Sequence, residues 1–183
     1  MENVKMEEVK RINRTLVKNG HVIDLYTDTM QFPDGKTADW DLVSHKGAAA
    51  VVAVTKEGKL LMVRQYRNAL ERYTLEIPAG GKDSVEEPAI ACAFRELEEE
   101  TGYRTEHLEH LLTLNTTVAF CDEKIEIYVA RDLIPSKQNL DEDEYLNVEE
   151  HELDELVQMI YDKKITDGKT MSAILAYKLK YGC

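Results

Sequence analysis

The chain has 183 residues, of which 43% are hydrophobic and 32% are charged, and its formal net charge is −12. This length and composition are typical of one well-buried globular domain with a small appended element. So acidic a chain, without a basic stripe, argues against a general nucleic-acid-binding protein. The longest apolar run, residues 48–54, is too short to span a bilayer, so we expect no membrane partner.

Residues 1–45 predict a separate antiparallel β element. Strands are expected over 12–17, 22–32 and 37–45, with a turn at 33–35. The segment has few large apolar side chains, so it needs another surface to pack on. That surface is either the main domain or a second subunit, and we expect the element to form a homodimer.

The N-terminus and the cysteines indicate a cytoplasmic protein. The first residues, MENVKMEEVKR, contain no apolar core, so we expect no signal peptide. Cys92, Cys121 and Cys183 form no CxxC pair and are typical of free thiols in a reducing compartment.

Residues 46–183 predict a single α/β domain. Strands are expected at 48–55, 60–66, 108–117 and 124–130, and helices at 88–101, 152–163 and 170–181. A polar, acidic loop is expected at 135–143. The alternation of strands and helices indicates an α/β sandwich with a mixed sheet.

The stretch GKDSVEEPAIACAFRELEEETGY, residues 81–103, is the most informative part of the chain. Pro88 suits the first turn of a helix and Gly102 its C-terminal end. At 100° per residue, Ile90, Phe94, Leu97 and Thr101 share one side, which we expect to face a core. Three glutamates, Glu96, Glu99 and Glu100, share the other side. Ala89 and Ala93 lie beside these glutamates and are expected to leave room above the helix for metals and phosphates.

This acidic side of the helix predicts a metal site. Like charges four residues apart destabilise a helix, and bound divalent cations would turn that repulsion into coordination. Carboxylate oxygens suit hard cations such as Mg²⁺ or Mn²⁺. A solvated acidic face is the alternative, and it would be preferred for an isolated EExxE run. The glycines, Glu87 and Arg95, all in register with the run, favour the metal site.

Taken together, residues 81–103 resemble the Nudix box, the signature of hydrolases that cleave nucleoside diphosphates linked to another group. Only Tyr103 departs, because the family usually has an aliphatic residue there. Residues 63–67 and 75–80 look like the run before the box in ADP-ribose pyrophosphatases, and 167–170 look like the start of their last helix.

The resemblance covers nearly the whole chain and implies a Nudix-type α/β/α sandwich. It implies that the N-terminal strands exchange contacts across a homodimer. The implied reaction is hydrolysis of ADP-ribose, a nucleotide sugar, to AMP and ribose 5-phosphate with Mg²⁺, for which Mn²⁺ can substitute.

The resemblance also carries over site residues. It implies that Glu96, Glu100 and the carbonyl of Ala79 hold the metal. An acidic loop, residues 140–145, matches one that supplies a catalytic glutamate and sometimes a further ligand. We assign Glu142 as the base and Glu144 as the metal contact, although the two roles could be exchanged and a solvated acidic turn is the alternative.

Other charged residues complete the expected site. Glu99 and Arg95 are placed with the catalytic group, and Arg95 is also expected to brace the loop and helix through Glu87. Arg64 and Arg67 are candidates for phosphate or ribose contacts, because a guanidinium fork matches such oxygens; solvated strand-edge residues are the alternative. The remaining substrate-binding candidates are Glu76 and Glu123.

One segment departs from the subfamily and weakens the choice of substrate. Thr117-Val118-Ala119-Phe120 stands where a Ser-Pro-Gly-Phe-like segment is usual, and losing the proline and the glycine changes the permitted loop shapes. Two alternatives therefore stay open. One is a pyrophosphatase for another substrate, such as GDP-mannose or a dinucleoside polyphosphate. The other is a module that binds ADP-ribose without cleaving it.

Overall fold

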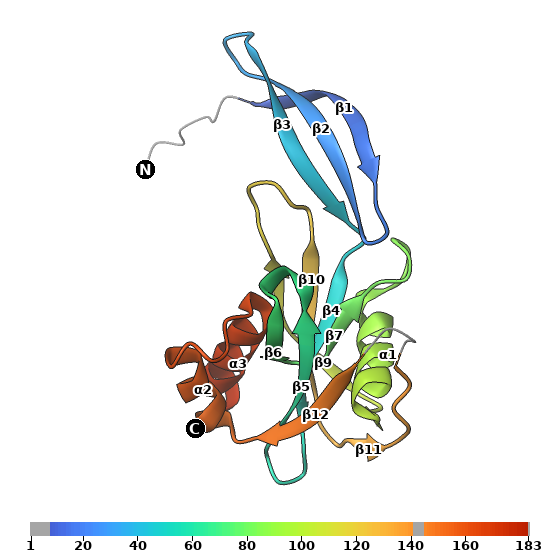
Figure 1. Ribbon diagram of the computed structural model, residues 1–183, viewed down its shortest axis with the longest axis vertical. Helices are drawn as coiled ribbons and strands as arrows, with labels where there is room; N and C mark the ends of the chain where they lie inside the picture. The colour runs from blue at the N-terminus through green and yellow to red at the C-terminus, as the bar shows by residue number, and fades with distance from the viewer. Residues whose placement is uncertain (1–7, 141–144, 183) are drawn as a thin grey trace. The chain divides into compact units, whose positions relative to one another are not determined.

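The computed structural model of the protein describes residues 8–140 and 145–182 (Figure 1). Its chain divides into two compact units. The smaller contains the described residues up to 46 together with 117–123, and the larger contains 47–116 and the described residues from 124 onward. Within the described residues no helix is long and apolar enough to cross a membrane.

The smaller unit is an antiparallel sheet of three strands in the order β1-β2-β3, as the sequence predicts (Figure 1). Its strands are β1 (Lys10–Asn19), β2 (Ile23–Gln31) and β3 (Thr37–His45). Every residue of β1 is exposed. The 117–123 segment attaches to β3, where the Val43 amide donates to the Phe120 carbonyl at 2.7 Å. In this unit, Glu123 lies 3.4 Å from His45.

The larger unit contains a mixed sheet with the order β12-β5-β4-β10-β9, and β6 and β7 pair with β5 and β4. Only the β4–β10 pair is parallel. The strands are β4 (Ala48–Val54), β5 (Leu60–Arg67), β6 (Arg72–Glu76), β7 (Ala79–Gly81), β9 (Leu108–Asn115), β10 (Lys124–Ala130) and β12 (Leu146–His151). A short 3-10 helix, Asn68–Leu70, joins β5 to β6, and β8 (Tyr103–Arg104) pairs with β11 (Ile134–Pro135).

Strand β12 was not predicted from the sequence. Leu146 and Val148 are its only large apolar residues and they alternate with polar ones, which gives a weak strand signal beside the long acidic loop. The strand forms because its backbone pairs with β5 along its whole length, from Leu146 with Gln65 to His151 with Leu60. This strand at the edge of the sheet therefore forms through pairing with β5 and not through its own strand propensity.

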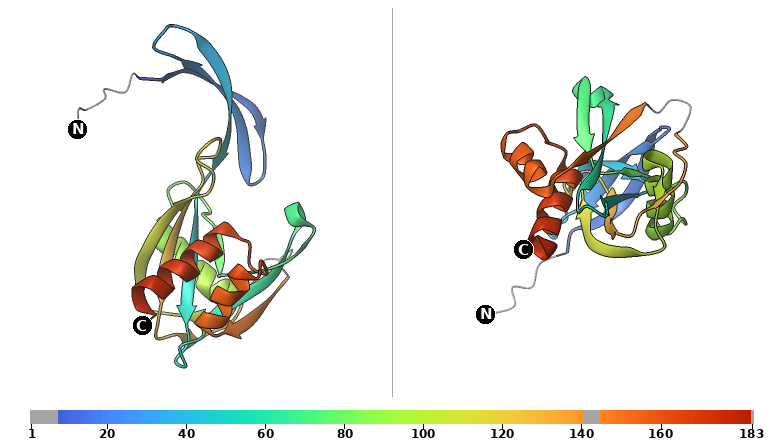
Figure 2. Two further views of the ribbon diagram at one scale, coloured as in Figure 1. Left: turned by 90° about the vertical axis from the view of Figure 1, so that its left-hand side faces the viewer. Right: turned by 90° about the horizontal axis from the view of Figure 1, so that it is seen from below.

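Strand β4 separates two hydrophobic cores, because successive side chains of a strand point to opposite faces. The set that includes Ala50 and Val52 packs toward α2 (Leu153–Tyr161) and α3 (Gly168–Tyr181). The set that includes Ala49 and Val51 packs toward α1 (Ala89–Thr101). Figures 1 and 2 show α2 and α3 on one side of the sheet and α1 on the other, which confirms the predicted α/β sandwich.

Candidate active site

The core-facing side of α1 agrees in part with the sequence prediction, because Leu97 and Thr101 are buried and Phe94 packs against the core. Ile90 is 42% exposed, whereas Glu96 is 7% and Glu100 is 2% exposed. Ala93 is fully buried in the core, so the room expected above it is taken up by packing. Among the residues expected to face the core, the prediction was wrong for Ile90 alone, and it did not anticipate that the carboxylates of Glu96 and Glu100 are buried as well. The helix contacts β4 and β7, and its buried residues include Leu97 and Thr101 together with Glu96 and Glu100.

Glu100 is held by the backbone of β7. The Ala79 amide donates to its Oε2 at 2.8 Å. On the other side of the same segment, the Val51 amide of β4 donates to the Pro78 carbonyl at 2.9 Å. The amide and carbonyl of one residue in an extended strand point the same way, so the Ala79 carbonyl lies on the side of α1 and Glu100. This orientation suits the predicted role of that carbonyl as a ligand.

Glu96 lies against Gly80. A Cβ built on Gly80 would come within 2.1 Å of the Glu96 carboxyl carbon. No other residue type fits there while Glu96 keeps its place, and Gly80 needs no unusual backbone angle. The absence of a side chain at residue 80 therefore makes the space that this carboxylate occupies.

Arg95 links the acidic residues of α1 to the preceding loop. Its Nη1 donates to Glu96 at 2.6 Å and to Glu99 at 3.1 Å, and its Nη2 donates to the Gly81 carbonyl at 2.9 Å. Its Nε lies 3.4 Å from Glu87. Burial alone would lower the pKa of Arg95, but the charge of Glu96 and the hydrogen bonds to the neighbouring carboxylates outweigh burial and raise it.

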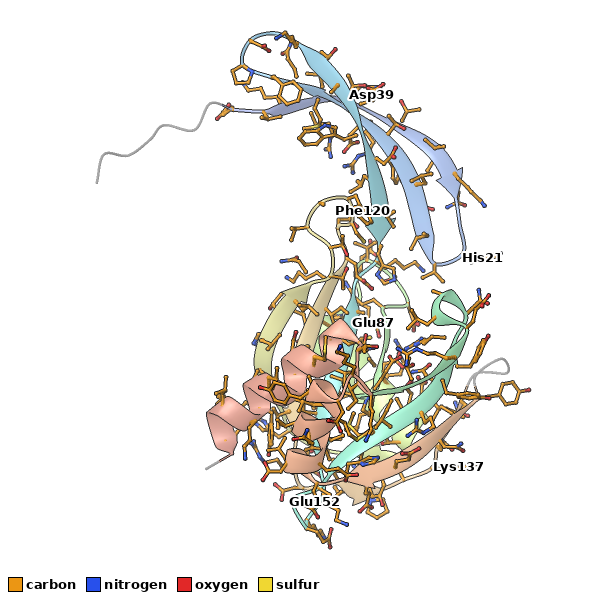
Figure 3. The ribbon with its side chains drawn as sticks, turned by 60° about the vertical axis from the view of Figure 1, so that its left-hand side comes forward. His21, Asp39, Glu87, Phe120, Lys137 and Glu152 are labelled. Carbon is orange, nitrogen blue, oxygen red and sulfur yellow. The ribbon has the colours of Figure 1, made fainter. Side chains whose placement is uncertain are left out.

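Glu87 fixes the loop that Arg95 braces. It accepts a hydrogen bond from the Asp83 amide at 2.7 Å and lies in the loop before α1 (Figure 3). Cys92, which the sequence analysis treated only as a free thiol, lies under the same loop, with its Sγ 3.4 Å from the Gly81 carbonyl. Burial raises the pKa of this thiol to about 12, so Cys92 acts as packing.

Some of these groups line a cavity of about 160 Å³. Its lining includes Gly80, Gly81, Arg95, Glu96, Glu99 and Asn139. Asn139 was missed from the sequence, since nothing local distinguishes it from other loop amides. Its backbone amide donates to the Glu99 carbonyl at 3.0 Å, which ties it to α1.

The donor set fits a hard divalent cation. Glu96 and Glu100 supply carboxylate oxygens one helical turn apart, and the Ala79 carbonyl lies on the same side of β7 as Glu100. Gly80 provides space for Glu96 beside the cavity. Within residues 8–140 and 145–182 no three acidic, histidine or cysteine side chains already converge as a ligand cluster. Glu142 and Glu144, the predicted base and further ligand, lie outside the described residues.

The predicted substrate-binding arginines are each paired with a carboxylate. Arg64 forms a fork with Glu149 across β5 and β12, with Nη2 3.0 Å from Oε2. Arg67 forms a fork with Glu76, at 2.8 and 2.7 Å. Glu76 is almost fully buried and also accepts from Lys169 and Thr74. The two arginines are therefore held in fixed orientations.

Burial alone would raise the pKa of Glu76, but hydrogen bonds from Arg67 and the charge of Lys169 outweigh burial and lower it to about 2. The partnership with Lys169 was missed from the sequence, because the two residues are 93 positions apart. The run Asp167-Gly168-Lys169-Thr170 resembles the start of a helix, but this resemblance does not indicate that Lys169 pairs with Glu76.

Glu76→Gln is expected to destabilise the protein at pH 7 by roughly 3 kcal/mol, because a carboxyl whose pKa is lowered on folding stabilises the native state when ionised. That contribution is complete above pH 4.5 and is lost as the pH falls toward 2. Urea unfolding at pH 7, 4 and 2.5 measures it. The gap between wild type and variant should close at low pH, and a gap independent of pH would contradict the ion-pair origin.

Three comparisons with known proteins show what this chain is similar to. The family model described as the NUDIX domain matches residues 44–173. The chain is 41% identical to the ADP-ribose pyrophosphatase of Bacillus subtilis (strain 168), over 97% of this chain and 96% of that protein. It is 43% identical to the methanol dehydrogenase activator of Bacillus methanolicus, over 96% of each. A crystal structure of an ADP compounds hydrolase has the same fold, with a TM-score of 0.83 at 22% identity, over 95% of this chain and 94% of that one.

Proposed function

The chain belongs to the Nudix family and is a Nudix hydrolase of the ADP-ribose pyrophosphatase type, and from this premise we propose that it hydrolyses the pyrophosphate bond of ADP-ribose or a related nucleotide sugar. From ADP-ribose the products are AMP and ribose 5-phosphate. The observation that carries the proposal is the placement of Glu96 and Glu100 against the Gly80 backbone and the Ala79 backbone, beside the cavity.

We propose Mg²⁺ as the resident cation, with Mn²⁺ as a substitute. Glu96, Glu100 and the Ala79 carbonyl would hold it, and Glu144 is proposed as a further ligand. When bound, the cation neutralises charge on the phosphates of the substrate. Arg95 orients Glu96 and Glu99 through its hydrogen bonds.

Glu142 is the proposed base, which orients or deprotonates the water that attacks phosphorus. Comparing kcat for Glu142→Gln and Glu144→Gln tests this assignment. If only Glu144→Gln loses rate, Glu144 would be the base and Glu142 the metal contact.

Substrate binding is proposed to involve Arg67 and Arg64, whose guanidinium groups suit phosphate and ribose oxygens. Glu76 is proposed to contribute through Arg67, since its carboxylate is buried in the fork with that arginine. Glu123 stays a proposed substrate contact from the smaller unit.

A panel of ADP-ribose, ADP-glucose, GDP-mannose and a dinucleoside polyphosphate tests the substrate. Hydrolysis is followed as release of AMP or the corresponding nucleotide at saturating Mg²⁺. The highest kcat/KM should be for ADP-ribose or another ADP-sugar. Preference for GDP-mannose or the dinucleoside polyphosphate would select the alternative substrate, and tight binding without turnover would select the binding module.

A second candidate function comes from the 43% identical relative named a methanol dehydrogenase activator. Its identity to this chain is slightly higher than that of the ADP-ribose pyrophosphatase, and its coverage is nearly the same. Adding the protein to a methanol dehydrogenase assay tests it. If the wild type raises the dehydrogenase rate and Glu100→Gln does not, the same site would serve both functions.

We also propose that the protein is a cytoplasmic homodimer. The smaller unit supports this, because its strand β1 is exposed throughout and includes Ile12, Leu16 and Val17. Light scattering at micromolar concentration should give twice the mass of 20.9 kDa. An active monomer at that concentration would contradict an intersubunit role for this unit.

A further inference from the structure

The first turn of α3 makes contacts that reach beyond its own helix. Asp167 caps the turn, with its Oδ2 accepting from the Thr170 amide at 3.0 Å and from the Thr170 hydroxyl at 2.6 Å. The same oxygen accepts from Lys169 at 2.9 Å. Thr170 is fully buried and the Lys169 side chain is 11% exposed. Both side chains are therefore held in place at the N-terminal end of α3.

Thr170 supports the segment that leads to Glu100. Its hydroxyl oxygen accepts a hydrogen bond from the Ile77 amide at 3.1 Å. Two residues later, the Ala79 amide donates to Glu100 at 2.8 Å. With Pro78 bonded to β4 between them, the short segment has little freedom to move. A shift at Ile77 would therefore be passed to Ala79, whose amide is bonded to Glu100.

Lys169 supports a different part of the site. It donates to Oε2 of Glu76, the oxygen that also accepts from Arg67 Nη2 at 2.7 Å. The fork uses Nε and Nη2 of Arg67, so Nη1 points away from Glu76. The Arg67 side chain is 41% exposed, whereas the side chains of Glu76 and Lys169 are only 2% and 11% exposed. Arg67 therefore presents its outer edge in a direction fixed by Glu76 and Lys169.

We propose that Thr170 and Lys169 are positioning residues of the active site, with separate targets. Thr170 sets Ala79 and Glu100 for the cation, and Lys169 sets Glu76 and Arg67 for the phosphates of the substrate. This proposal rests on the proposed function for its ligands. Neither residue touches the cation or the substrate, and each acts through hydrogen bonds whose donors and acceptors lie in other elements.

Thr170→Val tests the first half. Valine keeps the shape but removes the acceptor of the Ile77 amide. Loss of a partner bonded directly to a ligand weakens metal binding by about 10- to 100-fold, and the effect of Thr170, which acts through Ile77, is expected at the lower end of that range. The Kd of Mn²⁺, measured by electron paramagnetic resonance without substrate, should rise by about tenfold or more. Thr170→Ser, which keeps the hydroxyl, should restore wild-type affinity. Urea unfolding confirms that both variants are folded at the assay temperature.

Lys169→Met tests the second half. It should raise the KM for ADP-ribose by about tenfold, the effect of weakening one charge-assisted hydrogen bond, with a smaller change in kcat. Binding of AMP in the presence of Mn²⁺, measured by calorimetry, should weaken similarly, while the Mn²⁺ affinity itself stays at the wild-type value. Lys178→Met is the matched control, because it removes an exposed ion pair with Asp154 from the same helix.

The outcomes separate this proposal from the proposed function. If wild type does not cleave ADP-ribose, Mn²⁺ and AMP titrations still measure both positioning effects. Unchanged Mn²⁺ affinity in folded Thr170→Val would overturn the first assignment. Equal behaviour of Lys169→Met and Lys178→Met in the AMP titration would overturn the second. Loss of Mn²⁺ affinity in both Thr170→Val and Lys169→Met would show a general disturbance and overturn the separation of targets.

Discussion

Replacing Glu100 by Gln is expected to lower kcat at saturating Mg²⁺ by about 10²- to 10³-fold, because a metal ion contributes several kcal/mol of transition-state stabilisation and each 1.4 kcal/mol is about tenfold in rate. The substitution removes a charge at nearly constant volume. Glutamine can still accept the Ala79 amide, so the hydrogen bond at 2.8 Å in the wild type need not be lost. The fold should therefore survive.

Three measurements on the same preparation check this. Steady-state kinetics gives kcat, Mn²⁺ titration gives metal affinity, and circular dichroism with urea unfolding gives the state of the fold. Glu98→Gln is the matched control, since Glu98 is on the same helix but bonds to Ser136, not to β7. Near-normal kcat in the Glu100 variant, with normal Mn²⁺ affinity, would remove Glu100 from the metal site.

Gly80→Ala should strongly lower kcat while costing little stability. A Cβ at residue 80 would lie 2.1 Å from the Glu96 carboxyl carbon, so the carboxylate must move away. Because the obstructing group is the end of a flexible side chain, the shift is cheap for folding. It is costly for a site that needs this carboxylate in place, and we expect kcat to fall by about 10²-fold, in the range for one misplaced group.

Gly81→Ala provides the control for this prediction, because a Cβ there meets nothing within 4 Å. Its kcat and its urea midpoint should stay close to those of wild type. The two variants differ only in which of two neighbouring glycines gains a methyl group. Equal loss of activity in both would indicate that the loop backbone, not the room for Glu96, is the sensitive feature.

The sequence predicted the limits of the acidic helix and most of the residues that face the core. Pro88 and Gly102 correctly marked its limits, and the helix ends where Gly102 adopts a φ of 71°. Leu97 and Thr101 face the core as expected, whereas Ile90 does not, and the burial of the carboxylates was not predicted. Glu96 and Glu100 are buried since Arg95 and the backbone of β7 provide partners for them. Burial of a charged group depends on its partners, which periodicity does not encode.

Contacts between residues far apart in the sequence could not be predicted either. Glu76 was singled out only by resemblance, and its partners come from β5 and the start of α3. The pairing of Leu146–His151 with β5 likewise follows from a neighbour that the local pattern does not specify. The strands β4, β5 and β10 were predicted well, because their long apolar runs carry a strong signal without any partner.

The division of β4 into two faces has a consequence for how the protein can change over generations. Positions such as Ala49 and Val51 lie under α1, whereas Ala50 and Val52 lie under α2 and α3. Volume changes at the first set would move α1 and its carboxylates directly, whereas changes at the second would reach Glu100 only through Ala79, which packs against that core. In relatives that differ mainly in stability, substitutions in β4 should therefore fall at positions such as Ala50 and Val52. In relatives that act on different substrates, they should fall at the alternate positions, such as Ala49 and Val51.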